Sequence, residues 1–356
     1  MTDVIVTGGG SGGHVTPALA IADAIQAKNL DVLFVGSNSG LEEALVKPSG
    51  LAYRGISAGK LRRYFSLQNL LDVFRVLLGL VQAVVLVGRE RPKVVFSKGG
   101  FVAFPLVVAA WLWRIPVVAH ESDSTQGLAN RLSAPFIKTL CTGFPDTDAQ
   151  GFKGRVVYAG APIRPQLLKG NPQAGRALLS VAEGQGILLV TGGSLGADAL
   201  NACVVESLPA LNERGWYVVH VCGPGKERAA PSANYSAFDY VAEDWADLLA
   251  AADMVIARAG ANTVFELLAL KKPNLLIPLP ATGSRGDQID NAAYASAGGY
   301  SRVLAQSELS SERLLQEISA LQTDLDQVQQ QLASFEAPDA VAAIVAELER
   351  FLPKAQ

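Results

Sequence analysis

A histidine stands directly after a glycine-rich turn near the start of the chain. The string TGGGSGGHVTP over residues 7–17 places His14 behind Gly8, Gly10 and Gly13, and only three histidines occur in the whole sequence. An imidazole titrates near neutral pH, so at such a turn it could remove a proton from a hydroxyl or contact a ligand. His14 is therefore a candidate general base, and the alternative is a purely structural histidine.

The same turn formally contains the pattern G-x-G-x-x-G between a strand-like and a helix-like run. A dinucleotide-binding fold requires an acidic residue after its second strand to bind the ribose, but here Ser37, Asn38 and Ser39 follow that strand. A nicotinamide cofactor is therefore disfavoured, and a P-loop is disfavoured because no Walker lysine follows. A helix N-terminus remains, which is suited to a phosphate or to close approach of a substrate.

A second glycine turn, TGGSLGADALN, occupies residues 191–201. We expect Gly192, Gly193 and Gly196 to expose backbone N–H groups at the start of a helix, where the helix dipole favours an anion. A pyrophosphate is the obvious candidate. The alternative is a tight strand-to-helix turn without a ligand.

Two further strings carry side chains that could bind a sugar. Glu266 lies early in a predicted helix in RAGANTVFELLALKKP, and a carboxylate at such a place commonly accepts two ribose hydroxyls. The string GSRGDQIDNAAYA at 283–295 concentrates Asp287, Gln288 and Asn291 at a helix start. Both have ordinary alternatives, which are a solvated helical glutamate and a capped helix.

Strand-like runs alternate with helix-like runs along the whole chain, which indicates βαβ units and parallel sheets. The predicted strands are 3–7, 31–36, 94–97, 116–120, 187–191, 216–222, 253–258 and 274–279. We also expect Thr16 and Pro17 to form the N-cap and first turn of the first helix.

The strand, glycine turn and helix at VIVTGGGSGG recur at LLVTGGSLGA, 184 residues later. This echo predicts two doubly wound α/β domains that face each other across a cleft, with both glycine turns at the carboxyl ends of strands. The Gly- and Pro-rich segment 160–172 predicts the join. We assign residues 1–162 to the first domain and 163–356 to the second, and leave open whether the C-terminal helix packs back on the first.

Composition limits the function classes. A net charge of −3 and a pI near 5.7 argue against nucleic acid as a partner. The three cysteines lack metal-ligand spacing and the N-terminus does not resemble a signal peptide, so we expect a cytoplasmic location. The apolar runs 76–88 and 101–119 are too short, or too interrupted by Arg114 and prolines, to predict a membrane span. The second run instead predicts a buried helix, a turn and a buried strand.

One segment departs from the overall acidic balance. Residues 54–93 carry eight basic and two acidic residues, a net charge of +6. Apolar residues interleave with these bases and include Tyr64, Phe65, Leu70, Leu71 and Phe74. Such a surface could rest on anionic lipid, where each base contributes about 1 kcal/mol. The alternative is a core helix with solvated ends.

Seven strings in order closely resemble the MurG glycosyltransferases of peptidoglycan synthesis, and the similarity covers nearly the whole chain. They are GGGSGGHVTP (8–17), SKGGFVAFP (97–105), HESDSTQGLANR (120–131), GAPIR (160–164), GGSLGADALN (192–201), RAGANTVFE (258–266) and SRGDQIDNA (284–292). The resemblance implies a GT-B fold of two Rossmann-like domains. It also implies inverting transfer of N-acetylglucosamine from UDP-GlcNAc to the C4 hydroxyl of the muramyl sugar of undecaprenyl-diphospho-muramoyl-pentapeptide (lipid I), which yields lipid II.

The resemblance further implies which residues bind the donor, mainly in the second domain. They are Arg164, Gly193, Ser194, Ala242, Asn262, Thr263, Glu266, Gln288 and Asn291. Arg164 and Ser194 would hold the diphosphate, Glu266 the ribose hydroxyls, and the backbone near Ala242 the uracil. Gln288 and Asn291 would contact the GlcNAc hydroxyls.

The first domain would then be the acceptor and membrane side, and the protein would lie peripherally on the cytoplasmic face of the cell membrane. His14 matches the histidine of the family's first loop and is the candidate base. The other predicted acceptor-side residues are Gly12, Gly13, Thr16, Asp123 and Asn130. No Asp-x-Asp motif occurs at the donor site, so we expect no tightly bound metal, and loosely associated Mg²⁺ stays compatible. A cell-wall synthesis complex is a further partner that the resemblance leaves open.

Many relatives have Gln-Asn where this chain has Ser122 and Asp123, and His or Gln in place of Asp287, so the roles of Asp123 and Asp287 stay open. Three other functions compete with lipid II synthesis. They are sugar transfer from a UDP-sugar to diacylglycerol, 2-epimerisation of UDP-GlcNAc, and a non-catalytic membrane scaffold. The epimerase would require more acidic and histidine residues, and the scaffold would predict loss of Glu266, Arg164 and Gln288, which are all present.

Overall fold

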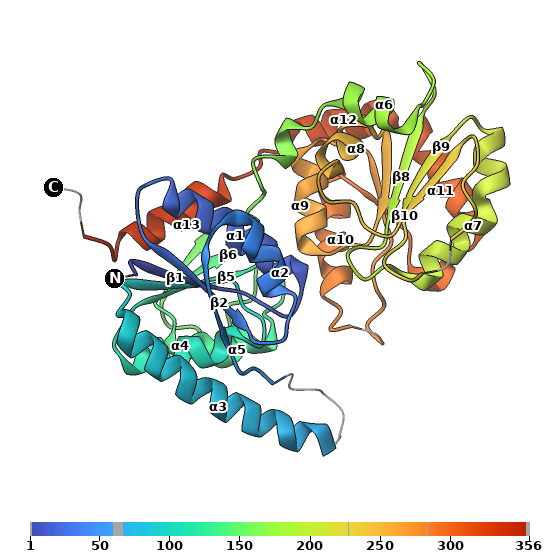
Figure 1. Cartoon of the computed structure of the whole chain (residues 1–356). Helices are drawn as coiled ribbons and strands as arrows, with labels where there is room; N and C mark the ends of the chain where they lie inside the picture. Colours follow the sequence, from blue (N-terminus) through green and yellow to red (C-terminus); the bar gives the residue numbers. More distant parts are fainter. Residues whose placement is uncertain (1, 60–66, 227, 283, 354–356) are drawn as a thin grey trace. The chain divides into compact units, whose positions relative to one another are not determined.

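The chain forms two compact units, described by a computed structural model that covers residues 2–59, 67–226, 228–282 and 284–353 and omits the side chains of 67–73 (Figure 1). Unit 1 comprises Met1–Arg164 and Pro338–Gln356, and unit 2 comprises Pro165–Ala337. The first segment of unit 1 ends two residues later than the sequence-based boundary, and the C-terminal segment returns to unit 1.

Unit 1 is built on a parallel sheet with the strand order β3-β2-β1-β4-β5-β6-β7. The strands in this order are Ala52–Ile56, Val32–Ser37, Val4–Thr7, Val94–Ser97, Val117–Glu121, Thr139–Thr142 and Arg155–Tyr158. The central strands are buried on both faces, which is why their sequences are continuous apolar runs. Strands are added toward one edge of the sheet from β1 to β3 and toward the other edge from β4 onward, so the carboxyl ends of β1 and β4 flank the place where such sheets bind ligands.

Two helical layers cover this sheet, and each encloses its own apolar core. Val4 and Val6 pack toward α1 and the C-terminal helix, whereas Ile5 packs toward α3 and α4. This alternation follows from the two-residue period of a strand. The helices of unit 1 are α1 (Gly12–Gln26), α2 (Glu42–Val46), α3 (Leu67–Glu90), α4 (Ala103–Leu112), α5 (Leu128–Ser133) and α13 (Ala340–Glu349).

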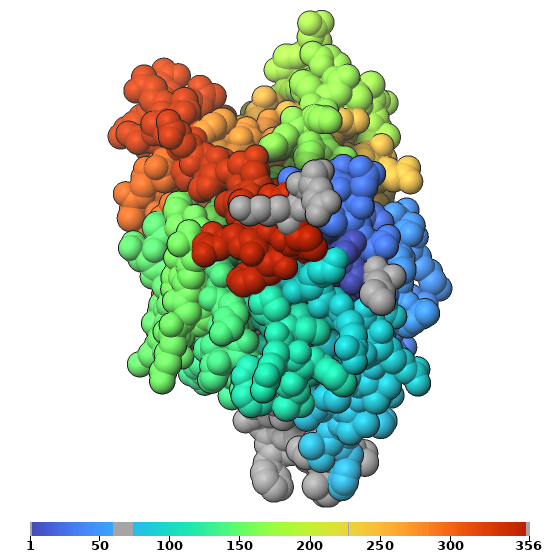
Figure 2. Space-filling model, turned by 90° about the vertical axis from the view of Figure 1, so that its left-hand side faces the viewer, coloured from blue at the N-terminus to red at the C-terminus, as the bar shows by residue number. Residues whose placement is uncertain are grey.

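The C-terminal helix α13 completes the core of unit 1 although it is last in the sequence. Its Ile344, Val345 and Leu348 are buried among residues of α1 and β1. Two ion pairs fix its polar side, Lys28 with Glu349 at 2.5 Å and Arg155 with Glu347 at 3.1 Å. Figure 2 shows this red segment against the blue and green parts of unit 1.

Unit 2 repeats the same winding with the strand order β10-β9-β8-β11-β12-β13. The strands in this order are Tyr235–Phe238, Tyr217–Val221, Ile187–Thr191, Met254–Ala257, Asn274–Leu276 and Arg302–Val303. The helices are α6 (Pro172–Leu179), α7 (Asp198–Glu213), α8 (Trp245–Ala251), α9 (Ala261–Ala269), α10 (Asp287–Ala297), α11 (Ser311–Thr323) and α12 (Leu325–Ser334). Strands are added toward one edge of this sheet from β8 to β10 and toward the other edge from β11 onward. The second glycine turn, which follows β8, therefore lies where the strand order reverses.

The predicted strands all exist, with ends shifted by up to three residues, but the edge strands and β6 were not predicted. The predicted start of the first helix is wrong. Helix α1 begins at Gly12 with Ser11 as its N-cap, so Thr16 and Pro17 lie inside it. The glycine turn itself begins the helix. Pro17, which was expected in the first turn, lies in the second turn and lacks a backbone N–H there.

Helix α3 carries apolar residues on its exposed face as well as on its buried face. Phe74, Leu77, Leu78, Val81 and Val85 are all exposed, by 62% at Phe74 and 61% at Val81. Ala83 and Val87 on the opposite face are buried in the core of unit 1. The alternative of a core helix with solvated ends is therefore wrong. Among the described residues, no helix combines the length and apolar content needed to cross a bilayer.

His220 in β9 makes the stability of unit 2 sensitive to acid. Its Nε2 pairs with Asn201 Oδ1 at 3.0 Å and its Nδ1 with the Tyr235 hydroxyl at 3.1 Å. Burial lowers the pKa of His220 from 6.5 to about 4. Between these two pH values the unfolded chain binds the proton and the folded chain does not, so stability falls as the pH falls through this window.

We expect acidification from pH 6.5 to 4 to cost up to about 3 kcal/mol through this histidine. Urea unfolding followed by circular dichroism at several pH values measures the slope. His220→Gln should reduce that slope whatever its effect on stability at pH 7. An equal slope in the variant and the wild type would contradict the assignment.

Candidate functional site

The loops after β1 and β4 meet at the reversal point of the first sheet. The N–H of Gly9 donates to the carbonyl of Gly99 at 3.3 Å, and the N–H of Lys98 donates to the carbonyl of Thr7 at 2.8 Å. Gly100 adopts a φ of +86°, and a Cβ there would lie 2.0 Å from the carbonyl oxygen of Gly9. This contact requires glycine, because no other residue allows the two loops to approach so closely.

The predicted acceptor-side residues of the first loop all lie on α1. Gly12 and Gly13 form its first two positions, and His14 follows as a half-buried side chain. Thr16 lies two residues further along the helix and is also half-buried. The helix N-terminus places His14 at the carboxyl edge of the sheet, which is where a proton acceptor for a bound hydroxyl would be required.

The loop after β5 brings the remaining acceptor-side residues to the same edge. Asn130 is buried at the start of α5, and its Nδ2 donates to Glu121 Oε2 at 2.9 Å and to the carbonyl of His120 at 3.2 Å. The backbone N–H of Asp123 donates to Glu121 Oε1 at 3.2 Å, and that of Gly127 donates to Oε2 at 2.8 Å. Asn130 therefore shapes the loop that carries Asp123.

Glu121, the buried carboxylate that ends β5 and accepts the hydrogen bonds of this loop, was not predicted from the sequence. Burial and the neighbouring Asp123 raise the pKa of Glu121, whereas its hydrogen bonds to Gly127 and Asn130 oppose that shift. The string HESD places Glu121 as the last residue of the buried strand β5, and a charged residue there could have been recognised as a loop anchor. His120 beside it is buried, and its Nε2 lies 2.7 Å from the carbonyl oxygen of Gly160.

A second missed carboxylate, Glu42, lies under the first glycine turn. It is fully buried at the first position of α2, where Oε1 accepts the N–H of Gly10 at 2.7 Å and Oε2 accepts the hydroxyl of Ser37 at 2.8 Å. The N–H groups of Gly9 and Gly10 are thus both engaged by protein acceptors. A phosphate or a close-lying substrate was expected at this turn. Because the N–H groups of Gly9 and Gly10 are already hydrogen-bonded, this part of the turn is better suited to close approach of a substrate than to binding a phosphate.

In unit 2 the second glycine turn leaves β8 and enters α7. Gly193 and Ser194 are exposed, and a Cβ on Gly193, whose φ is +82°, would meet only open space. The expectation that three glycine N–H groups are exposed is wrong for two of them. Gly193 donates to Thr191 Oγ1 at 3.2 Å, and Gly196 donates to the carbonyl of Gly193 at 3.0 Å, because the turn closes on itself.

Charged side chains border this turn. Asp198 begins α7 and pairs with Lys226 at 3.0 Å, and a Cβ on Gly196 would lie 3.0 Å from Cγ of Lys226. Lys226 follows β9, was not predicted from the sequence, and adds a cation beside the turn. The helix N-terminus and this cation together suit an anion such as a diphosphate.

Helix α9, which follows β11, the neighbour of β8 in the sheet, carries three predicted donor-binding residues, and Glu266 among them was predicted to bind the ribose. Asn262 and Thr263 are half-buried in the first turn of α9, and Glu266 is half-buried one turn later. Arg258, which was not predicted from the sequence, fixes the base of the loop between β11 and α9. Its guanidinium donates to the carbonyl of Ile277 at 3.0 Å and to Gln306 Oε1 at 2.6 Å.

Two residues predicted to contact GlcNAc hold loops in this structure. Asn291 is fully buried, and its Nδ2 donates to the carbonyl of Ala259 at 3.1 Å. Gln288 is half-buried, and its Oε1 accepts the N–H of Leu279 at 3.0 Å. Both amides therefore connect α10 to neighbouring loops. Their prediction as sugar contacts stays a prediction.

The other predicted donor residues lie at the ends of elements. Ala242 is exposed between β10 and α8. Asp287 begins α10 and accepts the backbone N–H of Arg285 at 3.3 Å, so its visible role is local. Arg164 is half-buried at the end of the first segment of unit 1. Its buried Nε has no hydrogen-bond acceptor among the described residues, which marks it as a donor available to a ligand.

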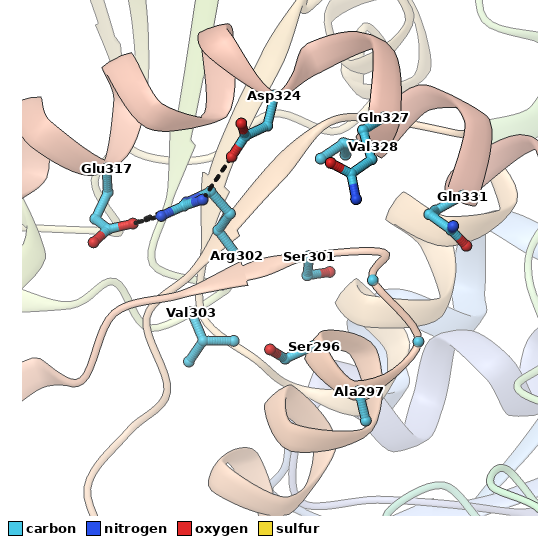
Figure 3. Close-up of a pocket in the computed structure, with 12 residues that line it drawn as sticks. Ser296, Ala297, Ser301, Arg302, Val303, Glu317, Asp324, Gln327, Val328 and Gln331 are labelled. Atoms are coloured by element: carbon cyan, nitrogen blue, oxygen red, sulfur yellow. Dashed lines mark hydrogen bonds and ion pairs between the residues drawn. The ribbon is translucent and has the colours of Figure 1, made fainter.

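Unit 2 also contains a pocket of about 600 Å³ formed by the end of α10, β13, α11 and α12. In Figure 3 Arg302 lies between Glu317 and Asp324, with hydrogen bonds of 2.9 and 3.1 Å. The predicted donor residues do not line this pocket. Across the described ranges, no three side chains of His, Cys, Asp or Glu are grouped to hold a metal ion.

Comparisons with known proteins assign both halves of the chain. Residues 4–142 match the glycosyltransferase family 28 N-terminal domain, and residues 187–344 match the glycosyltransferase family 28 C-terminal domain. Each match begins at or next to the first strand of one sheet and includes one glycine turn.

Close relatives share almost the full length of the chain. The UDP-N-acetylglucosamine--N-acetylmuramyl-(pentapeptide) pyrophosphoryl-undecaprenol N-acetylglucosamine transferase of Legionella pneumophila strain Paris is 45% identical over 347 residues, which cover 96% of this chain and 95% of that protein. The protein of the same name from Clostridium botulinum strain Langeland is 45% identical over 324 residues, 90% of this chain and 91% of that protein.

Solved structures agree with the described fold. MurG of Acinetobacter baumannii is similar with a TM-score of 0.76 and 26% identity, over 98% of this chain and 100% of that one. The kitacinnamycin glycosyltransferase has a TM-score of 0.76 at 18% identity, over 99% of each chain, and shows the fold alone. So does the UDP-GlcNAc 2-epimerase of Neisseria meningitidis, with a TM-score of 0.68 at 13% identity over 98% of this chain and 100% of that one. The predicted GT-B fold, with two parallel-sheet α/β domains, is confirmed.

Proposed function

The chain belongs to glycosyltransferase family 28 and, within it, to the MurG N-acetylglucosaminyltransferases, and we propose on that premise that it converts lipid I to lipid II. It transfers GlcNAc from UDP-GlcNAc to the C4 hydroxyl of the muramyl sugar, with inversion at the anomeric carbon. The observation that carries this proposal is the 45% identity over 96% of the chain to a transferase with that donor and acceptor in its name.

The arrangement of unit 2 supports a role in holding the donor. The exposed turn at Gly193 and Ser194, at the N-terminal end of α7 and beside Lys226, suits the diphosphate. Glu266 accepts the ribose hydroxyls, and Asn262 and Thr263 lie in the turn before it. Ala242 offers exposed backbone for the uracil.

The chemical step is an in-line displacement with two requirements. A base must remove the proton from the C4 hydroxyl while the departing UDP gains negative charge. His14 is the candidate base at the carboxyl edge of the first sheet. Arg164, whose Nε is without an acceptor among the described residues, and the dipole of α7 stabilise the leaving diphosphate. This scheme requires no tightly bound metal ion and is compatible with loosely associated Mg²⁺.

A direct test is to incubate the purified protein with labelled UDP-GlcNAc and a short-chain lipid I analogue. We expect a β-linked disaccharide product. Transfer to diacylglycerol without transfer to the lipid I analogue would replace this function with that of a diacylglycerol glycosyltransferase. Formation of UDP-ManNAc and no acceptor product would indicate a 2-epimerase instead, and donor binding without either reaction would indicate a scaffold.

The exposed apolar face of α3 supports peripheral attachment to the cytoplasmic leaflet. Its five exposed apolar residues follow helical spacing over 74–85, and the exposed Trp111, Leu112 and Trp113 end the neighbouring α4. Trp113 joins the two helices, because its Nε1 donates to the carbonyl of Val84 at 2.9 Å. A solvent-facing apolar face beside a basic segment is typical of interfacial helices. The bases Lys60, Arg62 and Arg63 of that segment, with Tyr64 and Phe65, lie outside the described residues.

We expect the double variant Leu77→Glu, Val81→Glu to bind vesicles at least about tenfold more weakly, because it places two charges on the membrane-facing side. Arg62→Glu with Arg63→Glu should weaken binding to anionic vesicles only, in a salt-sensitive way. Vesicle sedimentation with and without anionic lipid measures both effects. Leu178→Glu on α6, at a leucine that is 51% exposed, is the matched control. Equal binding by all variants would contradict attachment through α3.

A further inference from the structure

Lys98 is a buried cation that the chemistry described above does not use. It follows β4 directly and is only 1% exposed. Its backbone N–H donates to the carbonyl of Thr7 at the end of β1, and its Nζ donates to the hydroxyl of Ser122 at the end of β5. One residue thus connects the carboxyl ends of three neighbouring strands.

The first glycine turn rests directly on this lysine. A Cβ on Gly8 would lie 3.0 Å from the Cβ of Lys98 and 2.9 Å from the carbonyl oxygen of His14. The turn, the start of α1 and the lysine are therefore in close contact. A displacement of Lys98 would be transmitted to the backbone that carries His14.

Charged neighbours surround the ammonium group. Burial lowers the pKa of Lys98 to about 8, and the carboxylates of Glu121 and Asp123 oppose that shift. The pKa of His120 is lowered well below its usual value, first by burial and then by Lys98, so this imidazole stays neutral. At neutral pH the lysine is mostly protonated, and its nearest charges belong to the loop that carries Asp123.

A buried charge costs stability, and an apolar residue of equal length would fill the same space without that cost. The hydrogen bond and the charge of Lys98 can still specify one arrangement of the loops. We propose that Lys98 is a positioning residue for the acceptor. Through Ser122 and the first glycine turn, Lys98 holds the loops of unit 1 in the shape that receives the muramyl sugar of lipid I. This inference rests on the proposed function. It predicts an effect on the acceptor and none on the donor.

The test compares steady-state kinetics and thermal melting of the full chain and its variants, with the lipid I analogue and UDP-GlcNAc varied separately. Lys98→Met should raise the KM for the lipid I analogue by about tenfold or more, since small displacements of bound groups are costly. The KM for UDP-GlcNAc should stay within about twofold. The melting temperature is measured in parallel, because removal of Lys98 leaves the buried Glu121 without this neighbouring cation.

Two further variants examine the link to Ser122. Ser122→Ala should raise the KM for the lipid I analogue as Lys98→Met does. Ser122→Thr keeps the hydroxyl and should bring this KM most of the way back to the wild-type value. The double variant of Ser122→Ala with Lys98→Met should have a KM no higher than either single variant. Lys93→Met is the matched control, because Lys93 precedes the same strand, is exposed, and pairs with Asp3 at 3.2 Å.

An unchanged KM for the lipid I analogue in Lys98→Met would overturn the inference. So would a lower melting temperature with parallel losses for both substrates, since that pattern indicates a structural role. Failure of the wild type to transfer GlcNAc to the analogue would instead refute the proposed function. The two failures are therefore distinguishable in one set of assays.

Discussion

Glu266→Ala is expected to weaken the binding of UDP-GlcNAc by about 100-fold. A hydrogen bond to a charged acceptor contributes about 1.5–3 kcal/mol, so loss of two ribose contacts amounts to about 3 kcal/mol or more. Glu266 is suited to this role because it lies half-buried in α9, the helix that follows β11, and β11 neighbours the strand β8 that leads into the second glycine turn. Isothermal titration with UDP-GlcNAc measures the dissociation constant directly.

Because the ribose is remote from the reacting atoms, kcat at saturating donor should fall much less than the affinity. Glu266→Gln should show an intermediate loss, since an amide still accepts one hydrogen bond but carries no charge. Glu206→Ala, at an exposed position of α7, is the matched control for removal of a helical glutamate and should bind as the wild type does. An unchanged dissociation constant for Glu266→Ala would remove this residue from the donor site.

His14→Ala is expected to reduce kcat by about 10²–10⁴-fold, which is the usual contribution of general acid–base catalysis. The KM values for both substrates should change little, because a base acts mainly in the transition state. Initial rates at saturating donor and acceptor provide this measurement. His14→Asn should be equally slow, since an amide can donate and accept hydrogen bonds but cannot take up the proton.

The position of His14 also allows a different result. If kcat stays within about threefold while the KM for the lipid I analogue rises, His14 binds the acceptor and is not the base. A thermal melt of each variant separates both results from loss of folding, because His14 lies on the turn that contacts Lys98. Glu121 would then be examined next, as a buried carboxyl with a raised pKa at the same edge of the sheet.

Much of the fold was predictable because a parallel strand leaves a strong trace in the sequence. The strands β1, β4, β8 and β11 are buried on both faces and therefore read as short, continuous apolar runs. The edge strands β3 and β7 are largely exposed and lack such runs, so they were not predicted. The repetition of a glycine turn after the first strand of each half predicted two domains.

The candidate site was only partly predictable for a related reason. Glycine turns, His14 and Glu266 could be found because local spacing defines them. The burial of Asn291 and its hydrogen bond to the carbonyl of Ala259 could not be found in this way, and its role as a sugar contact stays a prediction. Burial depends on what packs against a residue, and neighbours along the chain do not reveal that.

The sequence by itself determined most of the buried strands, the two glycine turns, the basic segment and the family, because each depends on residues that are near one another or on ordered strings. Only the tertiary structure decided the strand order, the return of α13 to unit 1, and the contacts of Lys98 and Glu42 beneath the first glycine turn. Thr7, Lys98 and Ser122 are far apart in the sequence and meet only because β1, β4 and β5 are neighbours in the sheet. Pairing of distant strands brings their carboxyl ends to one edge, and that edge creates the site.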